Sequence, residues 1–241
     1  MAEEIYLEDS YVKKFDAVVK EVNGRFIVLD RTAFYPQGGG QPSDTGKLKS
    51  QDGEVYEVNF VKKMGDNILH EVDKEGLREG QIVNGEIDWD RRYLFMRYHT
   101  AAHILSAIVH KRTKALITGN QISDSKARID FNLEDFDRDK LDEFVNETNE
   151  IIKEHLPVKT EMMSRDEAFK IPSIVKLKKF LPEAIKEIRV VSIEGIDQQA
   201  CAGTHVSNTK EIGPIELINA ENKGKNNRRI NFILTELKTI F

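Results

Sequence analysis

Cysteine, proline and long apolar runs are scarce in this sequence of 241 residues. Its one cysteine, Cys201, cannot form a disulfide within the chain, which favours a reducing, cytoplasmic compartment and leaves the thiol to packing, nucleophilic chemistry or metal binding. No run of eighteen apolar residues occurs, and the start MAEEIYLEDS lacks the basic and apolar regions of a secretory signal. We therefore expect neither secretion nor a membrane-spanning segment. With six prolines and 39% apolar residues, the composition excludes collagen-like and wholly disordered classes.

The net charge of -5 argues against a protein that simply coats nucleic acid. Residues 134–154 contain nine acids and three bases, a net of -6, so the rest of the chain is about neutral. Two short stretches of that remainder are basic: Lys176, Lys178 and Lys179, and then Lys223, Lys225, Arg228 and Arg229. Charge alone leaves two readings open, a surface that faces a polyanion and ordinary solvated side chains.

The chain up to about Asp88 has the pattern of a β domain. Alternating apolar runs occur at residues 15–22, 26–29, 55–61 and 82–87, and turn dipeptides such as Asn23-Gly24 and Asp52-Gly53 separate them. Such short strands with tight turns predict a small barrel or sandwich. We place this N-terminal, β-barrel-like domain at residues 1–88.

Beyond residue 88 the pattern becomes mixed. Apolar residues at three- and four-residue steps predict a long helix over 89–111, and a strand is expected to end at residues 128–131. A second helix is expected at about 135–154, a capping box at Ser164 to Glu167, and strands at 188–193, 215–220 and 229–234. These elements predict an α+β domain over residues 89–241, so the fold class of the whole chain is α+β.

Two pairs of side chains have the spacing of metal ligands. His99 and His103 are four residues apart on the predicted helix and so point the same way. Cys201 and His205 repeat that gap far downstream, and a thiolate with imidazoles is the donor set that Zn²⁺ prefers. A metalloprotease is excluded because Thr100 stands where its glutamate would be, and a nucleobase deaminase needs two cysteines. A purely structural zinc remains an alternative, since four protein ligands would close the coordination sphere.

A glycine-rich segment lies in the β domain. It includes Thr32, the consecutive glycines Gly38, Gly39 and Gly40, and Gln41. Glycines in series suit a main chain that approaches a ligand closely or takes positive φ angles, although a flexible loop has the same composition. Neither a Walker loop nor a dinucleotide fingerprint matches, so the segment is a candidate binding loop of another kind.

These motifs together resemble a known family. His-x-x-x-His, Cys-x-Gly-Thr-His, the upstream Gly-Gly-Gly-Gln and Arg-Ile-Asp-Phe at 128–131 are similar to the editing domain of alanyl-tRNA synthetase and its free-standing relatives, the AlaX proteins. The resemblance covers nearly the whole chain. Ala202 departs from it, since the synthetases usually carry glycine there, but no ligand position is changed.

The resemblance implies a trans-editing hydrolase of the medium-length AlaX type, with a domain like the second additional domain of threonyl- and alanyl-tRNA synthetases. Such proteins deacylate tRNA(Ala) mischarged with serine, and often with glycine. One Zn²⁺ per chain is implied, with His99, His103, Cys201 and His205 as catalytic ligands. Asp197, four residues before Cys201, is a further candidate catalytic residue that orients a ligand or a water, although a surface carboxylate is the alternative at this position. Substrate contacts are expected from Thr32, Gly38, Gly39, Gly40 and Gln41. The hydroxyl of the substrate's serine is expected to be hydrogen-bonded by Thr118, Asn120 or Gln121.

The expected partner is therefore mischarged tRNA(Ala), with neither DNA nor a membrane, while the oligomeric state stays open. Two other functions fit the same motifs. One is a nonenzymatic RNA-binding module with a structural zinc, and the other is an editing domain for seryl-tRNA(Thr), which the glycine-rich N-terminal domain disfavours.

Overall fold

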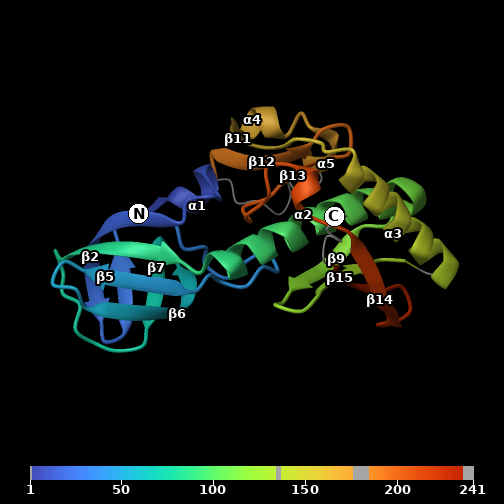
Figure 1. Ribbon diagram of the computed structural model, residues 1–241. Coiled ribbons are helices and arrows are strands. Elements are labelled where there is room, and N and C mark those ends of the chain that lie inside the picture. Colours follow the sequence, from blue (N-terminus) through green and yellow to red (C-terminus); the bar gives the residue numbers. More distant parts are fainter. Residues whose placement is uncertain (1, 134–136, 176–184, 236–241) are drawn as a thin grey trace. The chain divides into compact units, whose positions relative to one another are not determined.

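Six antiparallel strands close into a barrel within residues 1–95 of this computed structural model, which describes residues 2–133, 137–175 and 185–235 (Figure 1). In their order round the barrel they are β2 (Lys14–Asn23), β3 (Phe26–Leu29), β7 (Asn67–Val72), β6 (Val55–Met64), β5 (Gly46–Ser50) and β8 (Ile82–Ile87). Alternate residues of β5, β7 and β8 are buried, so apolar side chains fill the interior. The expected barrel is confirmed. Before it, β1 (Glu3–Glu4) pairs with β4 (Arg31–Thr32), and α1 (Ile5–Glu8) follows β1.

A fully buried ion pair anchors the start of α2 (Trp89–Thr113) within this unit. Nε of Arg92 lies 3.0 Å from both carboxylate oxygens of Asp44, and its Nη1 donates to the carbonyl of Ser10 at 2.9 Å. Asp44 in turn accepts a hydrogen bond from the Tyr35 amide at 2.6 Å. A buried charge is tolerated only when it is paired and hydrogen-bonded in this way.

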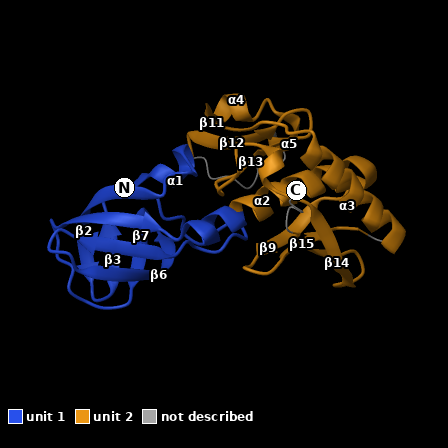
Figure 2. Cartoon of the chain, in the orientation of Figure 1, with its two compact units in different colours: residues 1–95 blue, residues 96–241 orange. Residues whose placement is uncertain are grey.

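The second unit, residues 96–241, combines two antiparallel sheets with helices (Figure 2). The first sheet has the order β14 (Ile215–Asn222), β15 (Arg228–Leu234), β10 (Ala127–Phe131) and β9 (Ile117–Ile122). The second has the order β11 (Val158–Ser164), β12 (Glu187–Ile193) and β13 (Asp197–Ala200). Among the described residues, the helices after α2 are α3 (Arg138–Lys153), α4 (Arg165–Ala168), α5 (Pro172–Val175) and the 3₁₀ turn η2 (Thr209–Glu211).

Two helices hold the four-stranded sheet in place. The Tyr98 ring of α2 packs against Phe232 of β15 with ring centroids 6.0 Å apart. From α3, the Asn149 side chain bonds both the amide and the carbonyl of Ile215, at 2.8 and 3.0 Å. The apolar face of the sheet is therefore covered by helices of its own unit.

Most predicted element positions are confirmed, with one shift. The helix expected from about residue 135 begins at Arg138. Asp137 is its N-cap, because its side chain accepts a hydrogen bond from the Lys140 amide. The capping box at Ser164 and Glu167 is present. Residues 134–136 and the basic stretch Lys176, Lys178 and Lys179 lie outside the described residues. No helix in the described part of the chain is long and apolar enough to cross a membrane.

Candidate metal centre

Four predicted ligands converge in the second unit. His99 and His103 lie one turn apart on α2, while Cys201 and His205 belong to the loop that follows β13. Each residue offers one ligand atom, and the four atoms all lie within 4.8 Å of one another. The three imidazoles are buried and the cysteine is half-buried. Residues about a hundred positions apart in sequence thus form one compact donor set.

The spacing of these donors fits a tetrahedral zinc ion. Sγ of Cys201 lies 3.5 Å from Nε2 of His99 and 3.4 Å from Nε2 of His205. Zinc bonds of about 2.3 Å to sulfur and about 2.0–2.1 Å to nitrogen, at tetrahedral angles, place such atoms about 3.5 Å apart. These two distances are those of neighbouring ligands of one such ion, and all four ligand atoms lie within 4.8 Å of one another.

Two neighbouring side chains orient the imidazoles. Nδ1 of His103 lies 2.9 Å from Oδ2 of Asp197, which leaves Nε2 for a metal. Thr100 performs the same task for His205, because its hydroxyl donates to the Met96 carbonyl at 2.9 Å and so can accept from Nδ1 of His205 at 3.1 Å. Hydrogen bonds of this kind fix the tautomer of a metal-binding histidine.

The charges of the cluster also suit a cation. Burial disfavours a charged Cys201, but the neighbouring His99 and His205 outweigh it and hold the pKa of the thiol well below its ordinary value. Burial lowers the pKa of His205 to about 3, so this imidazole is neutral at physiological pH. Burial also disfavours the imidazolium of His103, yet its hydrogen bonds to Asp197 and Cys201 raise its pKa to about 10. A thiolate and neutral imidazoles are the forms that bind zinc, and a cation would displace the proton of His103.

An arginine that the sequence did not single out fixes the ligand loop. Nη1 of Arg189, on β12, donates to the carbonyls of Cys201 and Gly203, each at 2.8 Å. The amide of Gly203 points back at Sγ of Cys201 from 3.4 Å, which favours the thiolate. Thr100 and Arg189 have no motif of their own. The only sequence signal for Thr100 is its position beside His99.

The glycine-rich segment lies in the barrel unit and forms a tight turn. The main chains of Gly38 and Gln41 exchange two hydrogen bonds, at 3.1 and 2.9 Å. Gly39 and Gly40 have φ angles of 56° and 84°, the left-handed region that glycine adopts without strain. Gly39 is exposed whereas the Gln41 side chain is buried. Thr32 is fully buried, and its hydroxyl lies 2.8 Å from Nε2 of His70.

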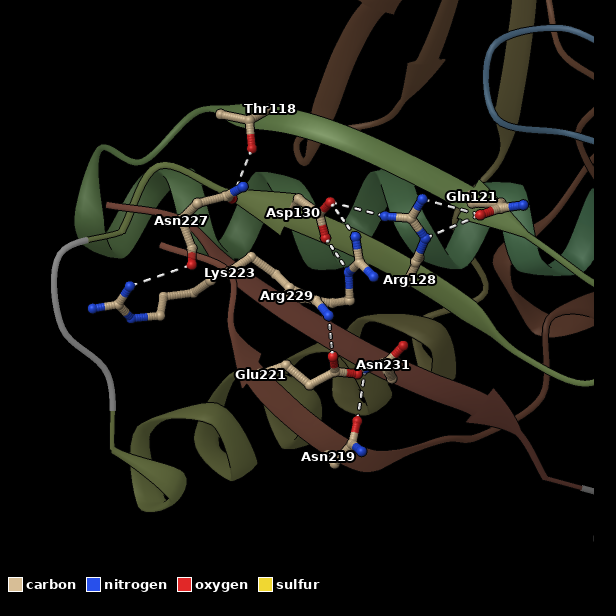
Figure 3. Close-up of polar contacts among 11 residues, drawn as sticks. Thr118, Gln121, Arg128, Asp130, Asn219, Glu221, Lys223, Asn227, Arg229 and Asn231 are labelled. Atoms are coloured by element: carbon tan, nitrogen blue, oxygen red, sulfur yellow. Dashed lines mark hydrogen bonds and ion pairs between the residues drawn. The ribbon is translucent and has the colours of Figure 1, made fainter. Parts of the chain in front are cut away.

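The three candidates for the serine hydroxyl are exposed residues of β9. The Thr118 hydroxyl donates to Oδ1 of Asn227 at 3.0 Å, and Oε1 of Gln121 accepts from Arg128 (Figure 3). Gln121 pairs with Arg128 and Asn120 with Ile129, so the side chains of these two neighbours project from opposite faces of the sheet. The structure thus does not bring all three groups to one surface.

Comparison with known proteins matches two family models to the chain. Residues 4–91 match the class II (A) tRNA synthetases, and residues 188–231 match the second additional domain of threonyl and alanyl tRNA synthetases. The first match covers the barrel and the second covers the two residues of the cysteine-containing ligand pair.

Full-length relatives are similar over nearly the entire sequence. An alanyl-tRNA editing protein AlaX-M of Methanosarcina barkeri is 47% identical over 243 residues, 98% of this chain and 100% of that protein. One from Saccharolobus solfataricus is 49% identical over 235 residues, 96% and 98% of the two chains. An alanine–tRNA ligase of Pyrococcus furiosus is 40% identical over 237 residues, 96% of this chain but 26% of the ligase.

Proposed function

Because the chain belongs to the AlaX-M family of alanyl-tRNA editing proteins, and is thereby an editing enzyme, we propose that it deacylates tRNA(Ala) mischarged with serine and also with glycine. The observation that carries this proposal is the convergence of His99, His103, Cys201 and His205 on one small volume. The reaction would take place in the cytoplasm and would need no cofactor other than one Zn²⁺.

Discrimination between amino acids explains why a separate hydrolase is needed. A synthetase pocket for alanine cannot exclude the smaller glycine and rejects an added hydroxyl only weakly. A second site that hydrolyses glycyl and seryl esters of tRNA(Ala) removes both wrongly attached amino acids. An editing protein of the AlaX-M family fits that task.

Within this site, each residue has a distinct part. Zinc held by His99, His103, Cys201 and His205 would supply a Lewis acid beside the aminoacyl ester. Oδ2 of Asp197 accepts a hydrogen bond from Nδ1–H of His103 and keeps that ring turned toward the other ligands. Its other oxygen, Oδ1, accepts a hydrogen bond from Nε2 of Gln199 at 3.0 Å, and Asp197 is one of the residues that line a cavity of about 710 Å³.

Recognition of serine is assigned to exposed polar groups of β9. We propose that Asn120 hydrogen-bonds the serine hydroxyl, since Thr118 already donates to Asn227 of the β14–β15 turn and Gln121 supports the strand through Arg128. An alanyl ester has no hydroxyl and would leave such a group without its partner. The expected loss is about 1–3 kcal/mol if the group is desolvated, or about 5- to 150-fold in kcat/KM.

The glycine-rich turn is the proposed contact for the RNA in the barrel unit. The main chain of Gly38, Gly39 and Gly40 can approach a nucleotide closely because no side chain intervenes, and the amides of Gly39 and Gly40 are the proposed donors because that of Gly38 bonds the Gln41 carbonyl. Thr32 and Gln41 are buried, so their part in this proposal is to hold the turn from inside. The Tyr35 hydroxyl assists by donating to the Gly38 carbonyl at 3.0 Å.

Substitution of one ligand tests the catalytic role of the metal. His103→Ala should abolish the release of serine from Ser-tRNA(Ala) and lower the zinc content measured by elemental analysis. His155→Asn, which changes an exposed histidine of the same unit, serves as the matched control and should leave both unchanged. Retained deacylation in His103→Ala protein that has lost its zinc would contradict a catalytic metal.

The two alternative functions give different results in the same assay. A binding module with a structural zinc would shift tRNA on a gel and protect the ester. An editing domain for seryl-tRNA(Thr) would release serine from that tRNA faster than from Ser-tRNA(Ala). A panel of seryl-, glycyl- and alanyl-tRNA(Ala) with seryl-tRNA(Thr), each with and without a chelator, separates the three.

A further inference from the structure

One face of the four-stranded sheet carries a continuous set of polar side chains (Figure 3). The strand register places cross-strand neighbours on the same side, since Gln121 pairs with Arg128, Arg128 with Asn231, and Asn231 with Asn219. We call this surface the polar sheet face. Its members are Gln121, Arg128, Asp130, Asn219, Glu221, Arg229 and Asn231.

Hydrogen bonds to one carboxylate hold the two guanidinium groups of this face. Arg229 binds Asp130 with two parallel hydrogen bonds, from Nε at 2.8 Å and Nη2 at 2.9 Å. Nη1 of Arg128 donates to the same carboxylate at 2.8 Å, and its other side bonds Gln121. These arginines keep the pKa of Asp130 below its ordinary value. Both guanidinium planes are therefore fixed before any partner arrives.

The polar sheet face points away from the metal centre. Ile230 and Phe232 alternate with Arg229 and Asn231 along β15 and so lie on the opposite side of the sheet. Phe232 there contacts Tyr98 of α2, the helix that carries the histidine ligands. This surface is thus separate from the proposed catalytic centre, and the reaction does not explain its composition.

The charge of the surface is opposite to that of the whole chain. The turn between β14 and β15 adds bases to one end of the face, and Lys223 and Lys225 there are exposed. Glu216, opposite Ile233, adds an exposed acid to the far end of the face. Together the face and turn contain five bases, Arg128, Lys223, Lys225, Arg228 and Arg229, against three acids, Asp130, Glu216 and Glu221. The local net charge is +2, in a chain whose total is -5.

We propose that the polar sheet face and the β14–β15 turn bind the phosphate backbone of the tRNA, away from its acylated end. This proposal rests on the proposed function, because it takes the same RNA as the partner. Each fixed guanidinium group has five N–H donors, more than its bonds to Asp130 and Gln121 use, and an exposed amide such as that of Asn219 is a common contact for a phosphate backbone. A second copy of the chain is a poorer partner, since two surfaces of net positive charge repel each other.

Charge changes that keep the local hydrogen bonds test the proposal. Asn219→Asp retains the acceptor that Asn231 uses at 2.7 Å and adds a negative charge, while Lys225→Gln removes an exposed positive charge. The matched control is Asn146→Asp with Lys153→Gln, which makes the same charge changes on exposed positions of α3. Thermal denaturation checks that both double variants are folded.

Binding of uncharged tRNA(Ala) is the direct measurement. At about 100 mM salt, Asn219→Asp with Lys225→Gln should weaken binding about tenfold or more, and the control should stay within about twofold. The slope of log affinity against log salt should fall by about 1 in the first variant, because one phosphate contact is lost. Equal affinities and salt slopes for the two folded variants would overturn the proposal.

A second substrate separates this proposal from the proposed function. The seryl ester of a short single-stranded oligonucleotide ending in CCA has no stem to reach the polar sheet face. Its hydrolysis should have the same kcat/KM in wild type and in Asn219→Asp with Lys225→Gln; a loss there equal to that with tRNA would overturn the docking role. Failure of the wild type to hydrolyse either ester would remove the proposed function, while the comparison of tRNA affinities would still decide the docking surface.

Discussion

Protonation of His70 should destabilise the barrel unit in mild acid. The side chain is fully buried: Nδ1 lies 3.0 Å from the Ile27 carbonyl and Nε2 lies 2.8 Å from the Thr32 hydroxyl. Because a carbonyl can only accept, Nδ1 carries the proton and Nε2 accepts from Thr32. The neutral ring is thus satisfied, and burial lowers the pKa of His70 from 6.5 to about 4.

The size and sign of the effect follow from this pKa. The unfolded chain binds a proton at His70 near pH 6.5, whereas the folded barrel resists protonation until about pH 4. The contribution to stability is therefore complete above pH 6.5 and is lost as the pH falls toward 4. At about 1.4 kcal/mol per pH unit the total is about 3 kcal/mol, of which about 2 kcal/mol is lost between pH 7.5 and pH 5.

Urea unfolding at several pH values measures this loss. Trp89 is the only tryptophan and belongs to the barrel unit, so its fluorescence reports on that unit. His70→Gln has no titrating ring and should show an unfolding free energy less dependent on pH by about 2 kcal/mol over that range, while His155→Asn should behave as wild type. Parallel curves for His70→Gln and wild type would refute the reasoning, because other titrating groups contribute equally to both.

Three further substitutions test the structure. Arg92→Met should lower the unfolding free energy of the barrel unit by about 3–5 kcal/mol, because it leaves the buried Asp44 without its partner; a change below 1 kcal/mol in urea unfolding would contradict this. Asp197→Ala should weaken zinc binding by about 10- to 100-fold in chelator competition, since His103 loses its acceptor, and unchanged affinity would exclude that role. Gly46→Ala should prevent stable folding of the barrel, because a Cβ there would lie 2.1 Å from a backbone carbonyl oxygen of β8; a thermal midpoint equal to wild type would show that the strands can separate at this point.

Local patterns were sufficient to predict most of the elements and the four residues of the candidate metal centre. Strand β3 occupies the expected residues 26–29, since alternation and the Asn23-Gly24 turn leave little choice of bounds. The helical spacing of His99 and His103 and the short gap between Cys201 and His205 predicted two pairs of donors, and the structure brings the four ligand atoms within 4.8 Å of one another, while their binding of zinc stays a prediction. Only the folded chain shows that the two pairs meet.

Interactions between distant residues could not be predicted in the same way. Arg92 on the predicted helix gives no sign that it is fully buried against Asp44, because nothing in the sequence specifies which carboxylate a buried arginine meets. Similarly, Arg189 lies within an apolar strand, and its bonds to Cys201 and Gly203 depend on the path of a loop. The sequence alone likewise did not predict which face of the sheet the side chains of Asn120 and Gln121 project from, because this depends on the strand register.

The hydrogen bonds from Arg189 to the loop that contains Cys201 and His205 have a consequence for exchange of the proposed metal ion. Arg189 fixes the carbonyls of Cys201 and Gly203 without any metal. The loop therefore loses its conformational entropy during folding rather than on binding of the proposed zinc ion. Small zinc fingers, by contrast, collapse when the ion is withdrawn. Here a chelator should leave an intact apoprotein that regains the ion on simple addition, with no refolding step between the two states.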